Sequence, residues 1–80
     1  MNDVEIVQRI TELADEEHEL ERSHAGQRLS DEDLRRLHAV EVTLDQCWDL
    51  LRQRRARRAA GEDPDGAGVR TEPTVEGYQQ

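Results

Sequence analysis

Apolar residues recur every three or four positions along two stretches of the chain. They are Ile6, Ile10, Leu13 and Leu20 in the first stretch and Leu34, Leu37, Val40, Leu44, Cys47, Trp48 and Leu51 in the second. This spacing is the period of an α-helix that buries one side. Residues 25–30 separate the stretches, a connection short enough to join antiparallel neighbours. The pattern therefore predicts an all-α antiparallel two-helix hairpin.

Capping signals predict where each helix begins. Asn2 is a good N-cap residue, and Glu5 follows three positions later, as a capping box requires. Ser30 is followed by Asp33 at the same spacing, which is a weaker form of the box. Both signals stand directly before an apolar stretch, so we expect the helices to start there.

The second helix is expected to end before Gly61, because glycine commonly terminates helices and Pro64 prevents the helix from resuming. Beyond it, glycine, proline and acidic residues predominate, and little apolar surface is available to bury. Val75 and Tyr78 are exceptions that could dock on a neighbour. The predicted segments are a hairpin of residues 1–60, with helices at about 3–24 and 31–60, and a disordered, flexible acidic tail of residues 61–80.

The apolar surface is wider than a two-helix seam needs. Antiparallel packing predicts Leu13 near Val40, Ile10 near Leu44 and Ile6 near Trp48. A chain of 80 residues with 34% hydrophobic residues is marginally stable alone, and a second copy would cover the surplus in a four-helix bundle. We therefore expect a homodimer. The residues expected to carry the association are Ile6, Ile10, Leu13, Leu44, Trp48 and Leu51.

Composition limits the cellular setting. Cys47 is the only cysteine, so a disulfide within one chain is excluded. No segment approaches the ~20 apolar residues of a membrane-spanning helix, and the N-terminus is acidic where a signal peptide would be basic. These features predict a cytoplasmic protein that does not contact the membrane.

A cluster of arginines near the end of the second helix stands out against a net charge of −8. The cluster consists of Arg52, Arg54, Arg55, Arg57 and Arg58. It could be a solvated helix end neutralised by Asp3, Glu5, Asp49 or the acidic tail, or it could bind an acidic protein partner. Nucleic acid is disfavoured because the chain is acidic overall and no aromatic residue interrupts the cluster.

The spacing of Glu21 and His24 matches the Glu-x-x-His motif of carboxylate-bridged di-iron bundles, with Glu17 one turn earlier. Two hairpins could bring two such motifs together. The simpler interpretation is that Glu17 pairs with an arginine or with His38 across the hairpin and that His24 is exposed. We expect no metal and no cofactor.

Catalytic chemistry has little support in this sequence. Ser30 is expected to cap a helix, Thr43 to lie on a helix surface, and Cys47 to lie on the core side. The chain has no glycine-rich phosphate loop. We therefore do not expect an enzyme.

Residues 44–55, with Asp-Gln-Cys-Trp-Asp-Leu-Leu at 45–51, resemble a family of small actinobacterial proteins, domain of unknown function 2630. Residues 15–18, 61–64 and 75–78 are also similar to it. The resemblance covers nearly the full length. It implies a bacterial, actinobacterial and cytoplasmic protein, and it transfers no function and no functional residues.

These observations favour a non-enzymatic protein–protein interaction module, such as a small adaptor, accessory subunit or regulator. One alternative is a nucleic-acid-associated regulator that uses the cluster from Arg52 to Arg58. Another is a metal-binding helical bundle that uses Glu17, Glu21 and His24. The sequence identifies neither the pathway nor a protein partner.

Overall fold

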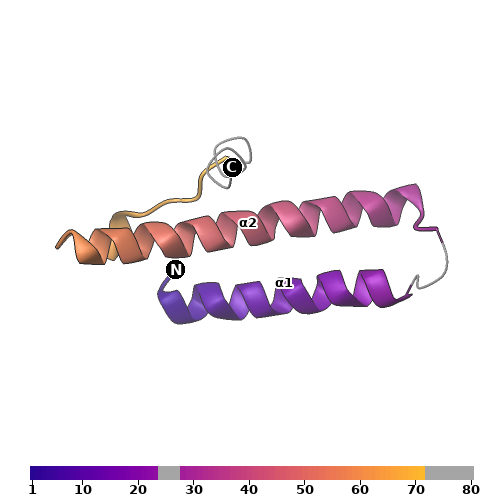
Figure 1. Cartoon of the computed structure of the whole chain (residues 1–80), viewed down its shortest axis with the longest axis horizontal. Coiled ribbons are helices and arrows are strands. Elements are labelled where there is room, and N and C mark those ends of the chain that lie inside the picture. The colour runs from indigo at the N-terminus through magenta and orange to yellow at the C-terminus, as the bar shows by residue number, and fades with distance from the viewer. Residues whose placement is uncertain (24–27, 72–80) are drawn as a thin grey trace.

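Two α-helices lie side by side in opposite directions in the computed structural model of the chain, which describes residues 1–23 and 28–71 (Figure 1). Helix α1 spans Asp3–Ser23 and helix α2 spans Asp31–Ala59. A short 3-10 helix, η1, covers Pro64–Gly66. The described residues contain no β-strand. The predicted all-α antiparallel hairpin is therefore confirmed.

Both helices begin where their capping residues predict. The backbone N–H of Asn2 donates to Oε1 of Glu5 at 2.9 Å, and the backbone N–H of Glu5 donates to Oδ1 of Asn2 at 2.8 Å. At α2, Oγ of Ser30 accepts a hydrogen bond from the backbone N–H of Asp33 at 3.1 Å. These bonds satisfy donors that the first turn of a helix leaves without a partner.

Helix α2 ends at a glycine that reverses the chain. Gly61 has a φ of 76°, in the left-handed region that residues with a Cβ rarely adopt. Behind it, the backbone N–H of Glu62 donates to the carbonyl oxygen of Arg57 at 2.7 Å. The same carbonyl oxygen also accepts from the backbone N–H of Ala60 at 3.1 Å, so the last turn of α2 is closed by backbone hydrogen bonds. The chain therefore leaves α2 already pointing back along it.

The core lies along the seam between α1 and α2. Its buried hydrophobic residues are Ile6, Ile10, Leu13, Val40, Leu44, Leu50 and Leu51. Leu20 and Leu37 are half-buried nearer the turn. The helical spacing of the predicted apolar stripe is thus confirmed for most of its members. Within the described residues, neither helix is long and apolar enough to cross a membrane.

Trp48 lies beside the seam and is not part of the buried core. Ile6 is fully buried, but Trp48 is 45% exposed. Each residue turns an α-helix by about 100°, so Leu51 points toward α1 while Trp48 points to one side of the seam. Trp48 therefore belongs to the apolar surface that the two-helix seam leaves over, and its expected part in the association stays a prediction.

Residues 62–71, here called the strap, fold back along α2 (Figure 1). The side chain of Gln53 donates to the carbonyl oxygen of Gly68 at 2.7 Å, and the side chain of Gln46 donates to the carbonyl oxygen of Arg70 at 3.1 Å. Ala67 packs against the core. The predicted tail of residues 61–80 thus includes a segment, the strap, that contacts α2.

The sequence does not reveal these contacts, because side chains of α2 bind mainly the backbone carbonyls of the strap. Such contacts leave no apolar pattern in the sequence. Gly66 also lies against an arginine of α2, because an added Cβ there would stand 2.7 Å from Nη1 of Arg57. The remaining tail residues 72–80, with the docking candidates Val75 and Tyr78, lie outside the described residues.

Candidate protein-interaction surface

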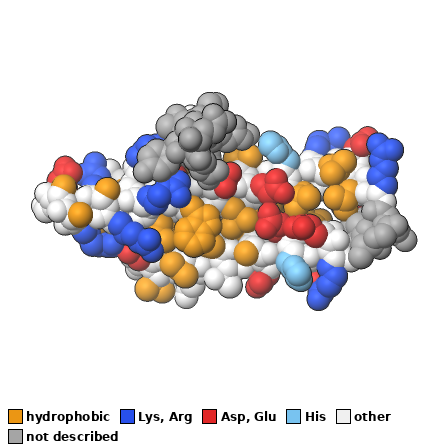
Figure 2. Space-filling model, viewed as in Figure 1, with side chains coloured by type: hydrophobic (Ala, Val, Ile, Leu, Met, Phe, Trp, Pro, Cys, Tyr) orange, Lys and Arg blue, Asp and Glu red, His pale blue; other side chains and the backbone are white. Residues whose placement is uncertain are grey.

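One side of the hairpin leaves apolar side chains exposed beside the seam. Val7 of α1 is 48% exposed, and Trp48 and Leu34 of α2 are each 45% exposed. The antiparallel register of the helices places Val7 next to Trp48. Figure 2 shows this hydrophobic patch over the seam, toward the viewer. We call the surface that carries Val7, Leu34 and Trp48 the open face.

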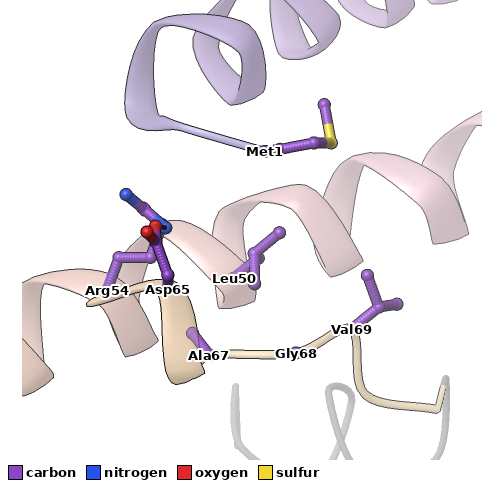
Figure 3. A pocket seen from close by; sticks show the side chains of 7 residues that line it. All are labelled: Met1, Leu50, Arg54, Asp65, Ala67, Gly68 and Val69. Atoms are coloured by element: carbon purple, nitrogen blue, oxygen red, sulfur yellow. Dashed lines mark hydrogen bonds and ion pairs between the residues drawn. The ribbon is translucent and has the colours of Figure 1, made fainter. Parts of the chain in front are cut away.

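The opposite side of α2 is covered by the strap, and we call it the closed face. Leu50 is only 8% exposed there. Figure 3 shows Leu50 between Met1 on one side and Ala67 and Val69 of the strap on the other. A shallow hollow of about 260 Å³ remains between them. The chain thus covers this side of α2 with its own two end segments.

The strap is fastened by Arg54, which is only 6% exposed. Its Nε donates to Oδ1 of Asp3 at 2.5 Å, and its Nη1 donates to Oδ1 of Asp65 at 3.0 Å. Nη2 of Arg58 lies 2.6 Å from the same oxygen of Asp3. The Arg58 and Arg54 guanidinium groups hold the pKa of the Asp3 carboxyl at about 2. One arginine therefore joins α1, α2 and the strap.

The arginine cluster is consequently not a uniform cationic surface. Arg54 and Arg58 are engaged by carboxylates of the same chain, as the interpretation of an internally neutralised helix end predicts. Arg57 lies against Gly66 of the strap. Arg52 is half-buried, whereas Arg55 is exposed. Arg58 is exposed as well but pairs with Asp3, so Arg55 is the exposed arginine of the five that makes none of the ion pairs described above.

Asp49 is a structural residue that sequence reasoning did not assign to the strap. It is only 1% exposed. Its Oδ2 accepts a hydrogen bond from the side chain of Gln53 at 2.9 Å and lies 3.4 Å from Nε of Arg70. A buried carboxylate requires such partners. The only sequence signal is an acid beside the apolar residues of α2, and it does not reveal that Arg70 is the partner.

Acidic residues gather on the open face beyond Trp48, toward the hairpin turn. Burial raises the pKa of the Glu17 carboxyl, and the neighbouring charges of Glu21, Glu41 and Asp45 raise it further. Figure 2 shows acidic side chains directly to the right of the central hydrophobic patch. We call Glu17, Glu21, Glu41 and Asp45 the acidic patch. Its like charges repel one another within the single chain.

The metal-site alternative used two of these residues. Glu17 is half-buried and Glu21 is exposed, while His24 lies outside the described residues. Within residues 1–23 and 28–71, no three histidine, cysteine or acidic side chains are arranged to hold a metal ion. The described residues therefore provide no observation that favours this alternative.

The candidate nucleophiles are in structural positions. Oγ of Ser30 caps α2, and Oγ1 of Thr43 donates to the carbonyl oxygen of Ala39 at 2.9 Å. Cys47 is half-buried, and burial raises the pKa of its thiol. A raised pKa disfavours the thiolate that nucleophilic chemistry requires.

The surfaces described above can now be compared with known proteins. The model of a family described as protein of unknown function (DUF2630) matches residues 2–80. The chain belongs to the DUF2630 family. The match includes both helices, the strap and the open face, and it confirms the resemblance seen around residues 44–55.

Proteins similar to this chain occur in mycobacteria. Uncharacterized proteins of Mycobacterium bovis and Mycobacterium tuberculosis are each 47% identical to it over 78 residues, which are 95% of this chain and 88% of the relative. No solved structure matches the chain. The family assignment therefore brings no function with it, and a function has to be argued from the surfaces themselves.

Proposed function

We propose that the chain is a non-enzymatic protein–protein interaction module that acts as a homodimer through its open face. The observation that carries this proposal is the exposure of Trp48, at 45%, beside Val7, at 48%. Tryptophan is enriched at the centres of protein interfaces. An exposed apolar patch that spans two helices fits a protein–protein interaction site better than single scattered apolar residues do.

Energetics also favour association. Small domains bury a low fraction of their surface and are marginally stable. The described residues 1–23 and 28–71 form a single layer of core between α1 and α2. Burial of apolar surface contributes about 25 cal/mol per Å². Covering the open faces of two chains would therefore contribute several kcal/mol, which is comparable to the whole stability of a small domain. A four-helix bundle is the assembly that this argument favours.

A non-enzymatic role in the cytoplasm is part of the same proposal. The half-buried Cys47 thiol has a raised pKa, and the Ser30 and Thr43 hydroxyls are engaged by the backbone. A lone cysteine fits a reducing compartment. Nucleic-acid binding is less favoured, because Arg54 and Arg58 already pair with carboxylates of the chain.

Light scattering coupled to size exclusion over a concentration series of the full chain tests this proposal. We expect twice the 9.2 kDa mass of one chain, with dissociation on dilution. Trp48→Ala should shift the equilibrium to monomer. Val69→Ala is the matched control, because Val69 is 68% exposed but lies on the strap. A wild-type chain that stays monomeric at every concentration would overturn the proposal.

A further inference from the structure

The open face of α2 carries a stripe of residues at alternating steps of four and three. Its members are Leu34, His38, Glu41, Asp45, Trp48, Arg52 and Arg55. Such steps form one continuous line along a helix that packs against another helix. The charged members change sign along this line, because those before Trp48 are acidic and those after it are arginines. The stripe thus has an acidic half and a basic half, with the tryptophan between them.

The two halves are placed symmetrically about Trp48. Glu41 precedes it by one heptad and Arg55 follows it by one heptad, so each lies about 10 Å from Trp48 along the helix. Both side chains are exposed. Figure 2 shows arginines on one side of the hydrophobic patch and acidic side chains on the other. A surface of this kind is complementary to itself after a half-turn about its centre.

We propose that a second copy of the chain docks antiparallel on the open face, with the two α2 helices crossing at Trp48 and Glu41 of each copy facing Arg55 of the other. This inference rests on the proposed function and adds the orientation and the charged contacts of the dimer. Asp45 then falls near Arg52 of the other copy, because both lie within four residues of the crossing point.

The distribution of charge along each chain discriminates between a parallel and an antiparallel dimer. Each chain carries −8, so two copies repel unless opposite charges are placed together. A parallel dimer would set the acidic patch of one copy against that of the other. The half-turn about Trp48 instead brings arginines to the acidic patch, whose members already repel one another within the chain. Electrostatic complementarity of this kind fixes orientation more than it adds affinity.

Charge reversal on the full-length chain tests this arrangement, with the dimer Kd measured by sedimentation and helicity checked by circular dichroism. Glu41→Arg or Arg55→Glu alone turns both attractive contacts of the two-fold dimer into repulsive ones, and we expect the dimer to weaken about 100-fold. The double variant Glu41→Arg/Arg55→Glu restores opposite charges, and its Kd should return to within about tenfold of wild type. Recovery in the double variant excludes misfolding as the cause of weakening.

Arg35→Glu is the control, because Arg35 is also exposed but lies on the other side of α2 from Trp48. It should leave the Kd within about tenfold of wild type. Mixing the Glu41→Arg and Arg55→Glu chains should produce a heterodimer tighter than either homodimer.

The failures of the two proposals look different. A wild-type monomer overturns the proposed function and this inference together. A wild-type dimer that tolerates both single reversals overturns only the antiparallel arrangement and indicates another contact face or a parallel orientation. A dimer that both single reversals weaken but the double variant does not restore also overturns the pairing of Glu41 with Arg55.

Discussion

Three consecutive residues of α2 differ sharply in burial between the open face and the closed face. Trp48 is 45% exposed on the open face, whereas Asp49 and Leu50 are 1% and 8% exposed on the closed face. An aspartate is buried here and a tryptophan is exposed, against the usual preference of both residues. The difference teaches that burial depends on what covers a face. The strap covers one side of α2, and no described segment covers the other.

A substitution in the core between α1 and α2 should lower the stability of the chain more than any change on either face. Ile6 is fully buried between the helices. Ile6→Ala should lower the free energy of unfolding by about 3 kcal/mol, because it removes buried methyl groups and leaves a cavity. Urea denaturation followed by circular dichroism measures this loss. A change below about 1 kcal/mol would mean that the seam is not the main core.

The docking of the strap on the closed face should depend on Asp49. Asp49→Ala leaves Arg70 and Gln53 without their buried acceptor, so we expect a loss of about 2 kcal/mol and release of the strap. Faster tryptic cleavage after Arg70 reports that release directly. Asp45→Ala removes the same type of side chain from the open face and serves as the control. Equal cleavage rates in the two variants would contradict the role of Asp49.

Acid should weaken the ion pairs through which Asp3 of α1 holds Arg54 and Arg58 of α2. Arg58 and Arg54 hold the pKa of Asp3 at about 2, below its ordinary 3.8. A lowered pKa means that the ionised carboxylate stabilises the folded chain above pH 3.8 and that this contribution disappears as pH falls toward 2. Wild type should therefore exceed Asp3→Asn in stability near neutral pH and match it near pH 2. A gap that stays constant through this range would exclude the ion pair as its source.

On the open face, removing the charge of Glu17 should raise the stability of the folded chain slightly, whereas removing the charge of Asp3 should lower it. The raised pKa of Glu17 means that its charged form is disfavoured in the folded chain, so stability falls as pH rises through that pKa. Glu17→Gln should raise stability at neutral pH by about 0.3 kcal/mol. The gain should vanish at pH values below the ordinary 4.5 of this carboxyl. Asp15→Asn, on the exposed side of α1, is the control, and melting temperatures at both pH values measure the difference.

The hairpin could be predicted from the sequence because helix formation and core burial follow local patterns. Alternating steps of three and four residues identified the buried positions, and Asn2 and Ser30 identified the helix starts. The strap could not be predicted, since Gln46 and Gln53 bind its backbone carbonyls, and any residue supplies a carbonyl.

The residues expected to carry the association differ in their burial within the single chain. The predicted set combined Ile6, Ile10, Leu13, Leu44 and Leu51, which are buried within the single chain, with Trp48, which is exposed. Hydropathy does not separate a residue that faces the partner helix from one that faces a second chain. Only the rotation of α2 about its axis separates them, and the sequence pattern defines that rotation too coarsely.

The double attachment of Arg54 has a consequence for the order in which the chain folds. Asp65 lies 11 residues from Arg54, whereas Asp3 lies 51 residues away. Closing the longer loop costs about 1.4 kcal/mol more in chain entropy. The strap is therefore expected to dock on a nascent α2 before α1 arrives, and Asp65→Ala should slow folding by a larger fraction of its total destabilisation than Asp3→Ala. Stopped-flow kinetics would reject this order if the two fractions were reversed. In the expected order, α2 and the strap pack together first, and the N-terminal helix α1 packs on them last.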